Sequence, residues 1–322
     1  MSSSTSSFKN FGAGLMTFLC LLIAGHSMLH FGFIKQKQLT AEALLPKSDD
    51  YYLSFSSGGV DHYVLFHNYG NPAQHFRQAQ VLFLGNSRVK QGFAQSVLEP
   101  YFKKHELKFY NLGFGYNETS PLPLALIKKF DLHPKWVIIN ADQFFKDVPS
   151  FFSKTVMESD FFGAWKFSFE TSVSFYIRRF LHQFIPHVSV AHKDPHWIEY
   201  RSYINGSTLV AGYQGRSGPI NNPQPPKKLS KEVLRQILSI AKDFKSEIEK
   251  RGGRLVLTSV PPSNSNVAIE LGSALGVPVI TSKLTSLYSY DGSHLDVESA
   301  RRFSEEFSSE FEKILVAESK TR

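Results

Sequence analysis

Short apolar runs alternate with amphipathic stretches along the chain from Gln80 onward. Five runs predict buried parallel strands over Val81–Leu84, Leu107–Leu112, Trp136–Asn140, Arg254–Val260 and Val277–Thr281. Helical spacing predicts helices over Ala94–His105, Leu122–Phe130, Leu234–Ile248 and Val267–Leu275, and a last helix from an Asp296 N-cap. This alternation predicts an α/β fold, with a mainly parallel sheet and helices on both of its faces.

Residues 144–228 interrupt the alternation. They end in the proline-rich stretch Pro219–Pro226, and they begin with the aromatic pairs Phe144-Phe145, Phe151-Phe152 and Phe161-Phe162. We interpret this region as an insertion or cap on the sheet. Core packing is the default role of its phenylalanines. An acyl pocket and contact with a bilayer are the alternatives.

An uncharged apolar run covers residues 11–34, which contain no Asp, Glu, Lys or Arg. As a helix it would extend about 36 Å, enough for a hydrocarbon core of about 30 Å. The run predicts a transmembrane signal anchor. A cleaved signal peptide is the alternative, but the run is long for one and no A-x-A site follows it. Residues 1–10 are then a disordered cytoplasmic tail, 35–75 a stem and 76–322 the α/β domain.

Lysines on both sides of the run leave the orientation open by charge alone. A short tail before one large domain favours export of that domain. We therefore expect a single-pass protein of the cell (inner) membrane with an extracytoplasmic, periplasmic domain.

The formal net charge of +8 favours contact with anionic membrane surfaces or acidic polymers. The chain has no stripe of Arg and Lys with interleaved aromatics, so no nucleic-acid partner is expected. The single cysteine, Cys20, lies in the apolar run and forms no disulfide. The spacing of His187, His192 and His196 does not suit zinc, and there is no P-loop or dinucleotide fingerprint. We expect neither a metal nor a cofactor.

A serine follows the first predicted strand directly, in Gly85-Asn86-Ser87-Arg88. In parallel sheets, ligands bind at the carboxyl ends of the strands. The Ser87 hydroxyl is therefore placed as a nucleophile, with its backbone N–H near a helix N-terminus that stabilises a developing oxyanion. An ordinary N-cap serine is the simpler interpretation, and this segment alone does not decide between them.

The loop before the last predicted helix contains Asp291-Gly292-Ser293-His294. Histidine is the usual base for a serine, and an aspartate can fix its tautomer. Alone, the segment would be interpreted as a surface turn with an N-cap. Together with the serine, and in the order Ser, Asp, His along the chain, it predicts a catalytic triad of Ser87, Asp291 and His294.

These segments resemble the conserved blocks of the SGNH, or GDSL-type, hydrolases, a family with a flavodoxin-like α/β fold. Leu82–Ser87 is similar to its serine block, Asn111–Gly115 to its glycine block and Asp291–Leu295 to its D-x-x-H block. The resemblance covers about residues 80–311. It implies that Ser87 is the nucleophile, His294 the base and Asp291 its orienting carboxylate. It also implies that the backbone N–H groups of Ser87 and Gly113 form two arms of the oxyanion hole.

One block departs from the family. After the third strand the family has G-x-N-D, whose asparagine donates to the oxyanion, whereas this chain has Asn140-Ala141-Asp142-Gln143. An ionised Asp142 cannot donate a hydrogen bond. Either Asn140 or Gln143 supplies this third arm, or the arm is missing, at a loss of about 10²–10³ in rate. Arg88 and Asp142 are the candidate substrate-binding residues, and a structural salt bridge is an equal alternative for Arg88.

The resemblance extends to the membrane-anchored branch that acts on extracytoplasmic polysaccharides. It implies a serine esterase or O-acyltransferase whose partners are an acylated glycan or other ester, the membrane and a membrane-embedded acyl-donor protein. Two other functions stay open. One is a catalytically inactive subunit that binds a glycan or partner in an envelope modification or export complex. The other is a lipid esterase whose aromatic insertion gates an acyl pocket.

Overall fold

The computed structural model describes residues 50–54, 59–115, 117–160, 163, 166, 198–211, 218–220 and 229–320. All of them belong to one compact unit, Pro46–Arg322. Among them, no helix combines the length and apolar character that crossing a bilayer requires. The predicted tail and transmembrane segment, residues 1–10 and 11–34, lie outside the described residues.

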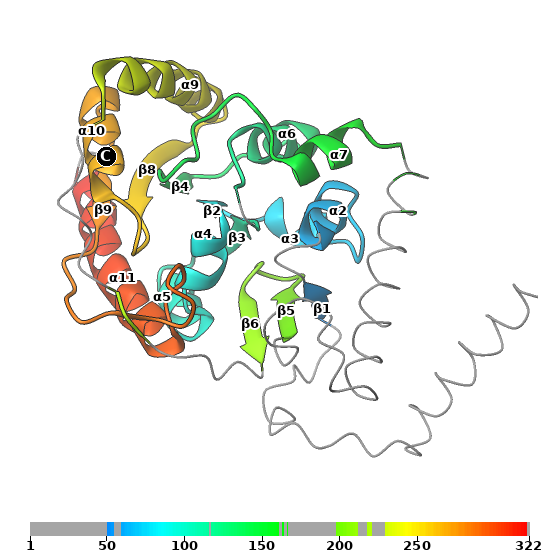
Figure 1. Cartoon of the computed structure of the whole chain (residues 1–322), viewed down its shortest axis with the longest axis horizontal. Coiled ribbons are helices and arrows are strands. Elements are labelled where there is room, and N and C mark those ends of the chain that lie inside the picture. The colour runs from blue at the N-terminus through cyan, green and yellow to red at the C-terminus, as the bar shows by residue number, and fades with distance from the viewer. Residues whose placement is uncertain are drawn as a thin grey trace, which may run out of the picture. The chain divides into compact units, whose positions relative to one another are not determined.

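A five-stranded, wholly parallel sheet forms the centre of this unit (Figure 1). Its strands lie in the order β3 (Phe109–Gly113), β2 (Val81–Gly85), β4 (Trp136–Asn140), β8 (Arg254–Ser259) and β9 (Val279–Thr281). Numbered along the chain, this is the order 2-1-3-4-5 of doubly wound sheets. The direction of winding reverses between β2 and β4, so the carboxyl ends of β2, β3 and β4 form the expected ligand site.

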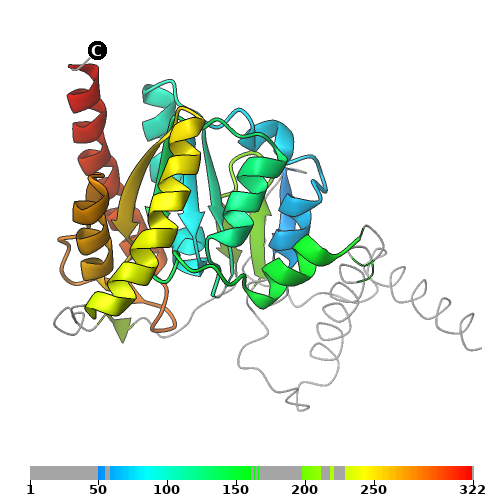
Figure 2. The same cartoon turned by 90° about the horizontal axis from the view of Figure 1, so that it is seen from above.

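Helices cover both faces of the sheet, as the sequence predicted. Successive side chains along a strand point to opposite faces of the sheet and enter two separate cores. In β2, Val81 and Phe83 belong to the first core, and Leu82 and Leu84 belong to the second. The second core packs against α3 (Ala73–Phe76), α6 (Pro121–Lys129), α9 (Lys231–Lys250) and α10 (Ser265–Leu275). The first packs against α4 (Ser87–Gly92), α5 (Gln95–Lys104) and α11 (Val297–Ser319). Figure 2 shows α6 and α9 in front of the strands.

The domain starts earlier than the predicted boundary at residue 76. Strand β1 (Tyr51–Ser54), helix α2 (Val60–Phe66) and helix α3 lie in the predicted stem. Leu65 and Ala73 are buried in the second core, the one that contains Leu82 and Leu84, so this part of the chain is not a free stem. The sequence pattern missed it because each element is short, which leaves too few positions to show a period.

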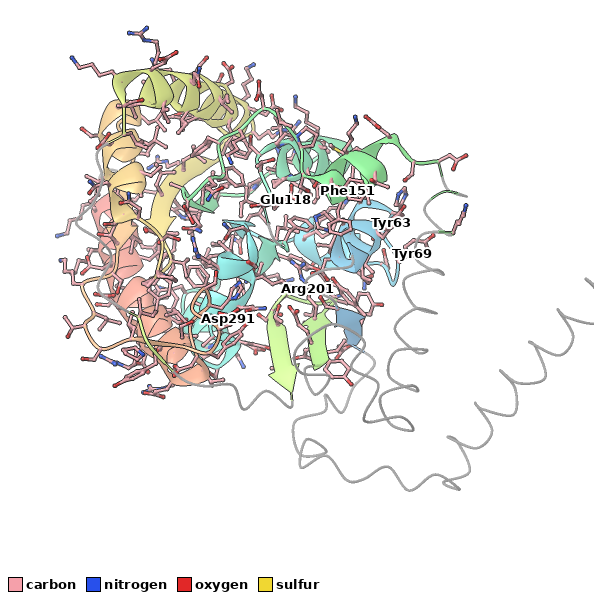
Figure 3. The ribbon with its side chains drawn as sticks, viewed as in Figure 1. Tyr63, Tyr69, Glu118, Phe151, Arg201 and Asp291 are labelled. Carbon is pink, nitrogen blue, oxygen red and sulfur yellow. The ribbon has the colours of Figure 1, made fainter. Side chains whose placement is uncertain are left out.

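The described part of the 144–228 region contains α7 (Phe151–Glu158) and strands β5 (Ile198–Ser202), β6 (Thr208–Ala211) and β7 (Gly218–Pro219). Phe144 and Phe145 are buried and pack against Phe244 of α9, with ring centroids 5.5 and 6.1 Å away. This pair is therefore core. Phe151, by contrast, is 76% exposed (Figure 3). Most of residues 161–197, including the Phe161-Phe162 pair, lies outside the described residues.

A second, antiparallel sheet in the order β1-β5-β6 covers the edge of the parallel sheet. The Asn111 N–H of edge strand β3 donates to Asn205 O over 2.8 Å. Arg201 Nη2 donates to Asn111 O over 2.5 Å. The small sheet thus satisfies backbone groups that an uncovered edge strand would expose.

Candidate active site

Ser87 begins helix α4 at the point where β2 ends. Gly85 makes this turn possible, because a Cβ there would lie 2.5 Å from Val89 Cγ2 and 3.2 Å from Asn140 Cβ. Asn86 is the N-cap, and its Oδ1 accepts from the Arg88 N–H over 3.1 Å. The predicted role of N-cap therefore belongs to Asn86, which leaves the Ser87 hydroxyl available for other contacts.

Asp291 and His294 lie in a closed loop between β10 (Tyr288–Ser289) and α11. An antiparallel bridge between Ser289 and Leu295 closes the loop. Inside it, Ser289 Oγ accepts from the N–H groups of Gly292 over 2.7 Å and Asp291 over 3.3 Å. Leu295, the apolar residue after the histidine, is buried in the core and fixes the loop's far end. The loop therefore has a defined shape of its own.

The structure brings Ser87, His294 and Asp291 together, although the serine and the histidine are 207 residues apart. His294 Nε2 lies 2.8 Å from Ser87 Oγ, and His294 Nδ1 lies 2.7 Å from Asp291 Oδ2. An ionised carboxylate can only accept a hydrogen bond, so the proton of the neutral ring is on Nδ1. Nε2 is then free to accept the hydroxyl proton of Ser87.

The environment of Asp291 keeps its carboxylate ionised. Partial burial alone would raise the pKa. The hydrogen bond from His294, its charge and the N–H groups of Ser293 and His294 outweigh burial and lower the pKa of Asp291 to about 2. Both of these N–H groups donate to Oδ1 over 2.8 Å. One oxygen is thus bound by the backbone while the other orients the imidazole.

Tyr290 holds the imidazole on a second side. Its ring stacks on that of His294 at 18°, with the centroids 5.7 Å apart. Its hydroxyl donates to Gln91 Oε1 on α4. The ring of the base is therefore tied to the helix that carries Ser87.

Arg88 connects three loops at the carboxyl edge of the sheet. Its Nε donates to Ser293 O over 3.3 Å, and its Nη1 donates to Asp142 Oδ2 and, over 3.2 Å, to Ser263 Oγ. Ser263 Oγ in turn lies 3.2 Å from Asp142 Oδ2. The predicted substrate-binding residues Arg88 and Asp142 are thus an ion pair, with side chains 23% and 13% exposed.

Of the other predicted oxyanion donors, one is engaged by another acceptor and two have free amide nitrogens within the described part of the chain. The Gly113 N–H donates to Asn111 Oδ1 over 2.8 Å. Asn140 is fully buried and accepts from the Val260 N–H, while its Nδ2 has no partner among the described residues. Gln143 is exposed and accepts from Lys146 Nζ over 3.2 Å. Neither amide side chain makes a hydrogen bond with Ser87 in the described part of the chain.

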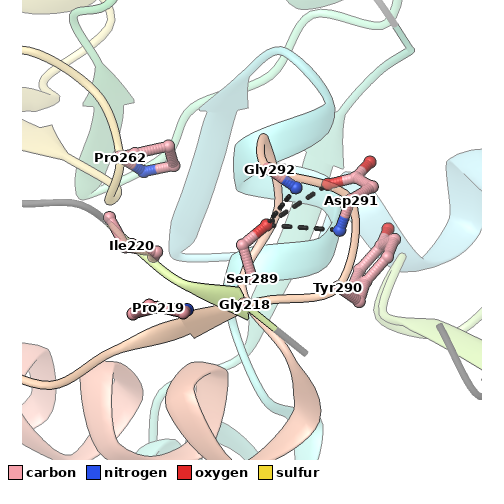
Figure 4. A pocket seen from close by; sticks show the side chains of 8 residues that line it. All are labelled: Gly218, Pro219, Ile220, Pro262, Ser289, Tyr290, Asp291 and Gly292. Carbon is pink, nitrogen blue, oxygen red and sulfur yellow. Dashed lines mark hydrogen bonds between the residues drawn. The ribbon is translucent and has the colours of Figure 1, made fainter. Parts of the chain in front are cut away.

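A hollow of about 430 Å³ adjoins the histidine loop (Figure 4). Asp291 and Tyr290 belong to its wall, whereas Ser87 does not. Its lining comes from the β7 and β10 segments and the loop after β8, and consists of Gly218, Pro219, Ile220, Pro262, Ser289, Tyr290, Asp291 and Gly292. Space for a molecule thus exists beside the triad, bounded largely by apolar and backbone atoms.

A buried cluster of charges lies one helical turn further along α4. Lys90 is fully buried, and its Nζ is 2.6 Å from both Asp61 Oδ2 and Glu199 Oε1. Arg201, also fully buried, approaches Asp61 Oδ2 at 3.2 Å (Figure 3). Burial acts against the ionised form of Asp61, but the charges of Lys90 and Arg201 outweigh it and hold the pKa of Asp61 well below its usual value. The cluster joins α2, α4 and the small sheet.

Sequence reasoning missed this cluster and the contacts of Tyr290 and Ser263. Lys90 stands one helical turn after Ser87, a spacing that was visible. Its partners Asp61 and Glu199 come from distant segments, so nothing in the sequence paired them. Among the described residues, no group of three or more His, Cys, Asp or Glu side chains is placed to hold a metal ion.

Comparison of the chain with protein-family models, with curated proteins and with solved structures finds no significant match.

Proposed function

We propose that the protein is a serine-dependent esterase or O-acyltransferase that uses Ser87, His294 and Asp291. One observation carries the proposal: the continuous chain of hydrogen bonds from Asp291 through His294 to Ser87 Oγ, at 2.7 and 2.8 Å. A serine hydroxyl is a weak nucleophile until a base takes its proton, and this arrangement supplies one. Its position at the switch point of the parallel sheet agrees with the SGNH-type resemblance.

In the first half of the reaction, Ser87 Oγ attacks the carbonyl carbon of an ester while its proton passes to His294 Nε2. The Oγ–C bond forms and the carbonyl π electrons move to the oxygen as an oxyanion. When the oxyanion collapses, the ester C–O bond breaks and the leaving alcohol takes the proton from His294. Asp291 stabilises the imidazolium meanwhile.

In the second half, an acceptor hydroxyl attacks the acyl-Ser87 carbonyl. His294 takes the acceptor's proton and returns one to Ser87 Oγ as the acyl–Oγ bond breaks. With water as the acceptor, the product is a free acid. With a sugar hydroxyl, the acyl group has been transferred. The same residues serve both outcomes.

The proposed setting is an extracytoplasmic envelope polysaccharide. The apolar run at residues 11–34 and the net charge of +8 support it, because an anchored basic domain would concentrate at an acidic glycan. A membrane-embedded protein would supply the acyl donor in the transferase case. The residues of this anchor lie outside those the structure describes.

A second candidate is a non-catalytic subunit that binds a glycan or a partner protein. The specific support for it lies on the oxyanion side of Ser87. The Gly113 N–H is engaged by Asn111, and an aspartate stands where the family has its donor asparagine. A site without these arms would stabilise an oxyanion poorly.

Labelling of the full-length chain with a fluorophosphonate probe separates the two candidates. We expect Ser87 to be phosphonylated in the wild type, Ser87→Ala to take no label, and His294→Ala to react at least about 10³-fold more slowly because no base remains. Ser319→Ala and His133→Ala are matched controls, since both residues are exposed and lie outside the site. No Ser87-dependent labelling and no turnover of acetyl esters by the wild type would overturn the enzyme and favour the binding subunit.

A further inference from the structure

The proposed reaction needs a donor for the oxyanion, and the family's usual donors are mostly engaged in other contacts. Resting on the proposed function, we propose that the guanidinium of Arg88 is this donor, with Asp142 as its positioning residue. Arg88 and Asp142 together would then replace the single asparagine of the SGNH pattern.

Two of the predicted neutral donors are engaged or out of a substrate's reach. The Gly113 N–H has an acceptor in Asn111 Oδ1 at 2.8 Å. The side-chain nitrogen of Asn140 is buried from solvent, so a substrate does not reach it. Gln143 is exposed and its Oε1 accepts from Lys146 Nζ, so nothing in these contacts fixes the direction of its amide. Arg88, by contrast, offers a partly exposed donor that is held in place and carries a positive charge.

Hydrogen bonds to three loops fix the Arg88 side chain at the edge of the sheet that carries Ser87 and the histidine loop. Its acceptors come from the loop after β4 (Asp142), the loop after β8 (Ser263) and the histidine loop itself (Ser293). Ser293 directly precedes His294, and Arg88 directly follows Ser87. The guanidinium is thus tied to the nucleophile on one side and to the loop of the base on the other.

The guanidinium retains donors for a ligand. Nε and Nη1 make the contacts to the three loops, while Nη2 makes no hydrogen bond within the described part of the chain. The side chain is 23% exposed, so a substrate carbonyl can approach it. A fixed cationic N–H donor is stronger than a neutral amide, and its orientation is already set before the reaction.

The pairing also resolves the charge problem posed by Asp142. A bare carboxylate at this position would repel an oxyanion, and an ionised carboxylate has no proton to donate. Paired with Arg88, it is neutralised and instead fixes the direction of the guanidinium. Removal of Arg88 then has two effects: the donor disappears and the charge of Asp142 is left uncompensated.

The test compares the full-length wild type with Arg88→Met, Arg88→Lys and the double variant Arg88→Met/Asp142→Asn. The readouts are the rate of fluorophosphonate labelling at Ser87 and kcat and KM for p-nitrophenyl acetate, a neutral ester. Arg77→Met is the matched control. Arg77 is exposed and likewise donates its Nε to a backbone carbonyl, that of Phe130, over 3.2 Å.

We expect Arg88→Met to lower kcat and the labelling rate by about 10²–10³, with KM little changed and Arg77→Met like the wild type. The double variant should recover at least about tenfold over Arg88→Met, because the Asp142→Asn change removes the repelling charge and restores an amide donor. The kcat of Arg88→Lys should exceed that of Arg88→Met by less than this, since lysine lacks the planar fork that contacts Asp142 and Ser293 together.

Two results would overturn the inference. One is that Arg88→Met keeps the labelling rate and the kcat of the wild type. The other is a rise in KM for p-nitrophenyl acetate with the kcat of the wild type, which would make Arg88 a substrate-binding residue. Thermal unfolding of each variant identifies a folding defect, because loss of an oxyanion donor lowers kcat even where the unfolding midpoint is that of the wild type. Failure of the proposed function itself gives a different pattern, an unlabelled wild type.

Discussion

Helix α4 takes part in two polar networks of opposite character. At its first turn, Ser87 and Arg88 belong to a partly exposed network with the histidine loop. One turn later, Lys90 belongs to a network that solvent does not reach, in which two cationic side chains balance Asp61 and Glu199. The buried network ties the helix to α2 and the small sheet, whereas the exposed one contains the groups that we propose transfer a proton. Because the two networks are separate, substitutions in the buried one should mainly change the protein's stability, and substitutions in the exposed one mainly its activity.

The largest effect should come from Asp291→Asn, which alters the exposed network alone. The asparagine amide can donate to Nδ1, which puts the ring proton on Nε2, so that His294 no longer accepts from Ser87. We expect kcat to fall by about 10⁴, together with a smaller loss of unfolding free energy at neutral pH because the ionised carboxylate also stabilises the native state. Steady-state hydrolysis of p-nitrophenyl acetate measures the first, and urea unfolding the second. A variant with near wild-type kcat would contradict the role of Asp291.

The same variant gives a pH signature. The pKa of Asp291 falls from 3.8 to about 2 on folding, so its carboxylate stabilises the native state above pH 3.8 and loses this effect as the pH drops through about 2. The difference in unfolding midpoint between wild type and Asp291→Asn should therefore narrow between pH 3.8 and 2. Asp61 is present in both proteins, so its titration affects both unfolding midpoints equally and does not change the difference between them.

The next effect, on stability, should come from Lys90→Met in the buried network. Methionine fills similar space but leaves Asp61 and Glu199 without their shared cation. We expect the unfolding free energy to fall by about 3–5 kcal/mol, measured by urea denaturation. Lys313→Met is the control, since that lysine is 68% exposed and pairs with Glu310 on the surface, where little change is expected. Equal stability of the two variants would show that the buried network does not hold α4.

A smaller effect, on both the unfolding free energy and the reactivity of Ser87, should come from Gly113→Ala. A Cβ at this position would lie 2.5 Å from Lys90 N and 2.9 Å from Lys90 Cα, so the backbone of α4 must shift. We expect a loss of about 1–3 kcal/mol and a slower reaction of Ser87 with the probe. Gly163→Ala is the control, because the described atoms that its Cβ would meet belong to the side chains of Asp160, at 3.1 Å, and Ser159, at 3.4 Å, and not to a backbone. Unchanged labelling would show that the position of Ser87 tolerates movement of the helix.

The sequence predicted the parallel sheet well because its strands are buried on both faces and appear as continuous apolar runs. Val81–Leu84 and Trp136–Asn140 show this pattern directly. The small sheet gave no such signal, since β5 carries Glu199 and Arg201 to buried positions where the pattern expects apolar residues. Pairing between distant charges cannot be read from spacing along the chain.

Prediction of the candidate site was similarly uneven. Ser87, Asp291 and His294 follow from motif and order, because each lies in a segment with a recognisable local geometry. The environment of Asp142 did not follow, since the sequence left Arg88 equally open to a substrate or to a salt bridge. Only the fold shows that the loops after β4 and β8 bring acceptors to the same guanidinium.

The loop closed by Ser289 and Leu295 contains both the base and its orienting carboxylate in seven consecutive residues. None of these residues belongs to the parallel sheet. Under the proposed function, loss of this loop would remove both groups at once, although no strand of the parallel sheet would be lost. The loop is thus the feature that would distinguish an enzyme with this sheet from a binding protein with the same sheet.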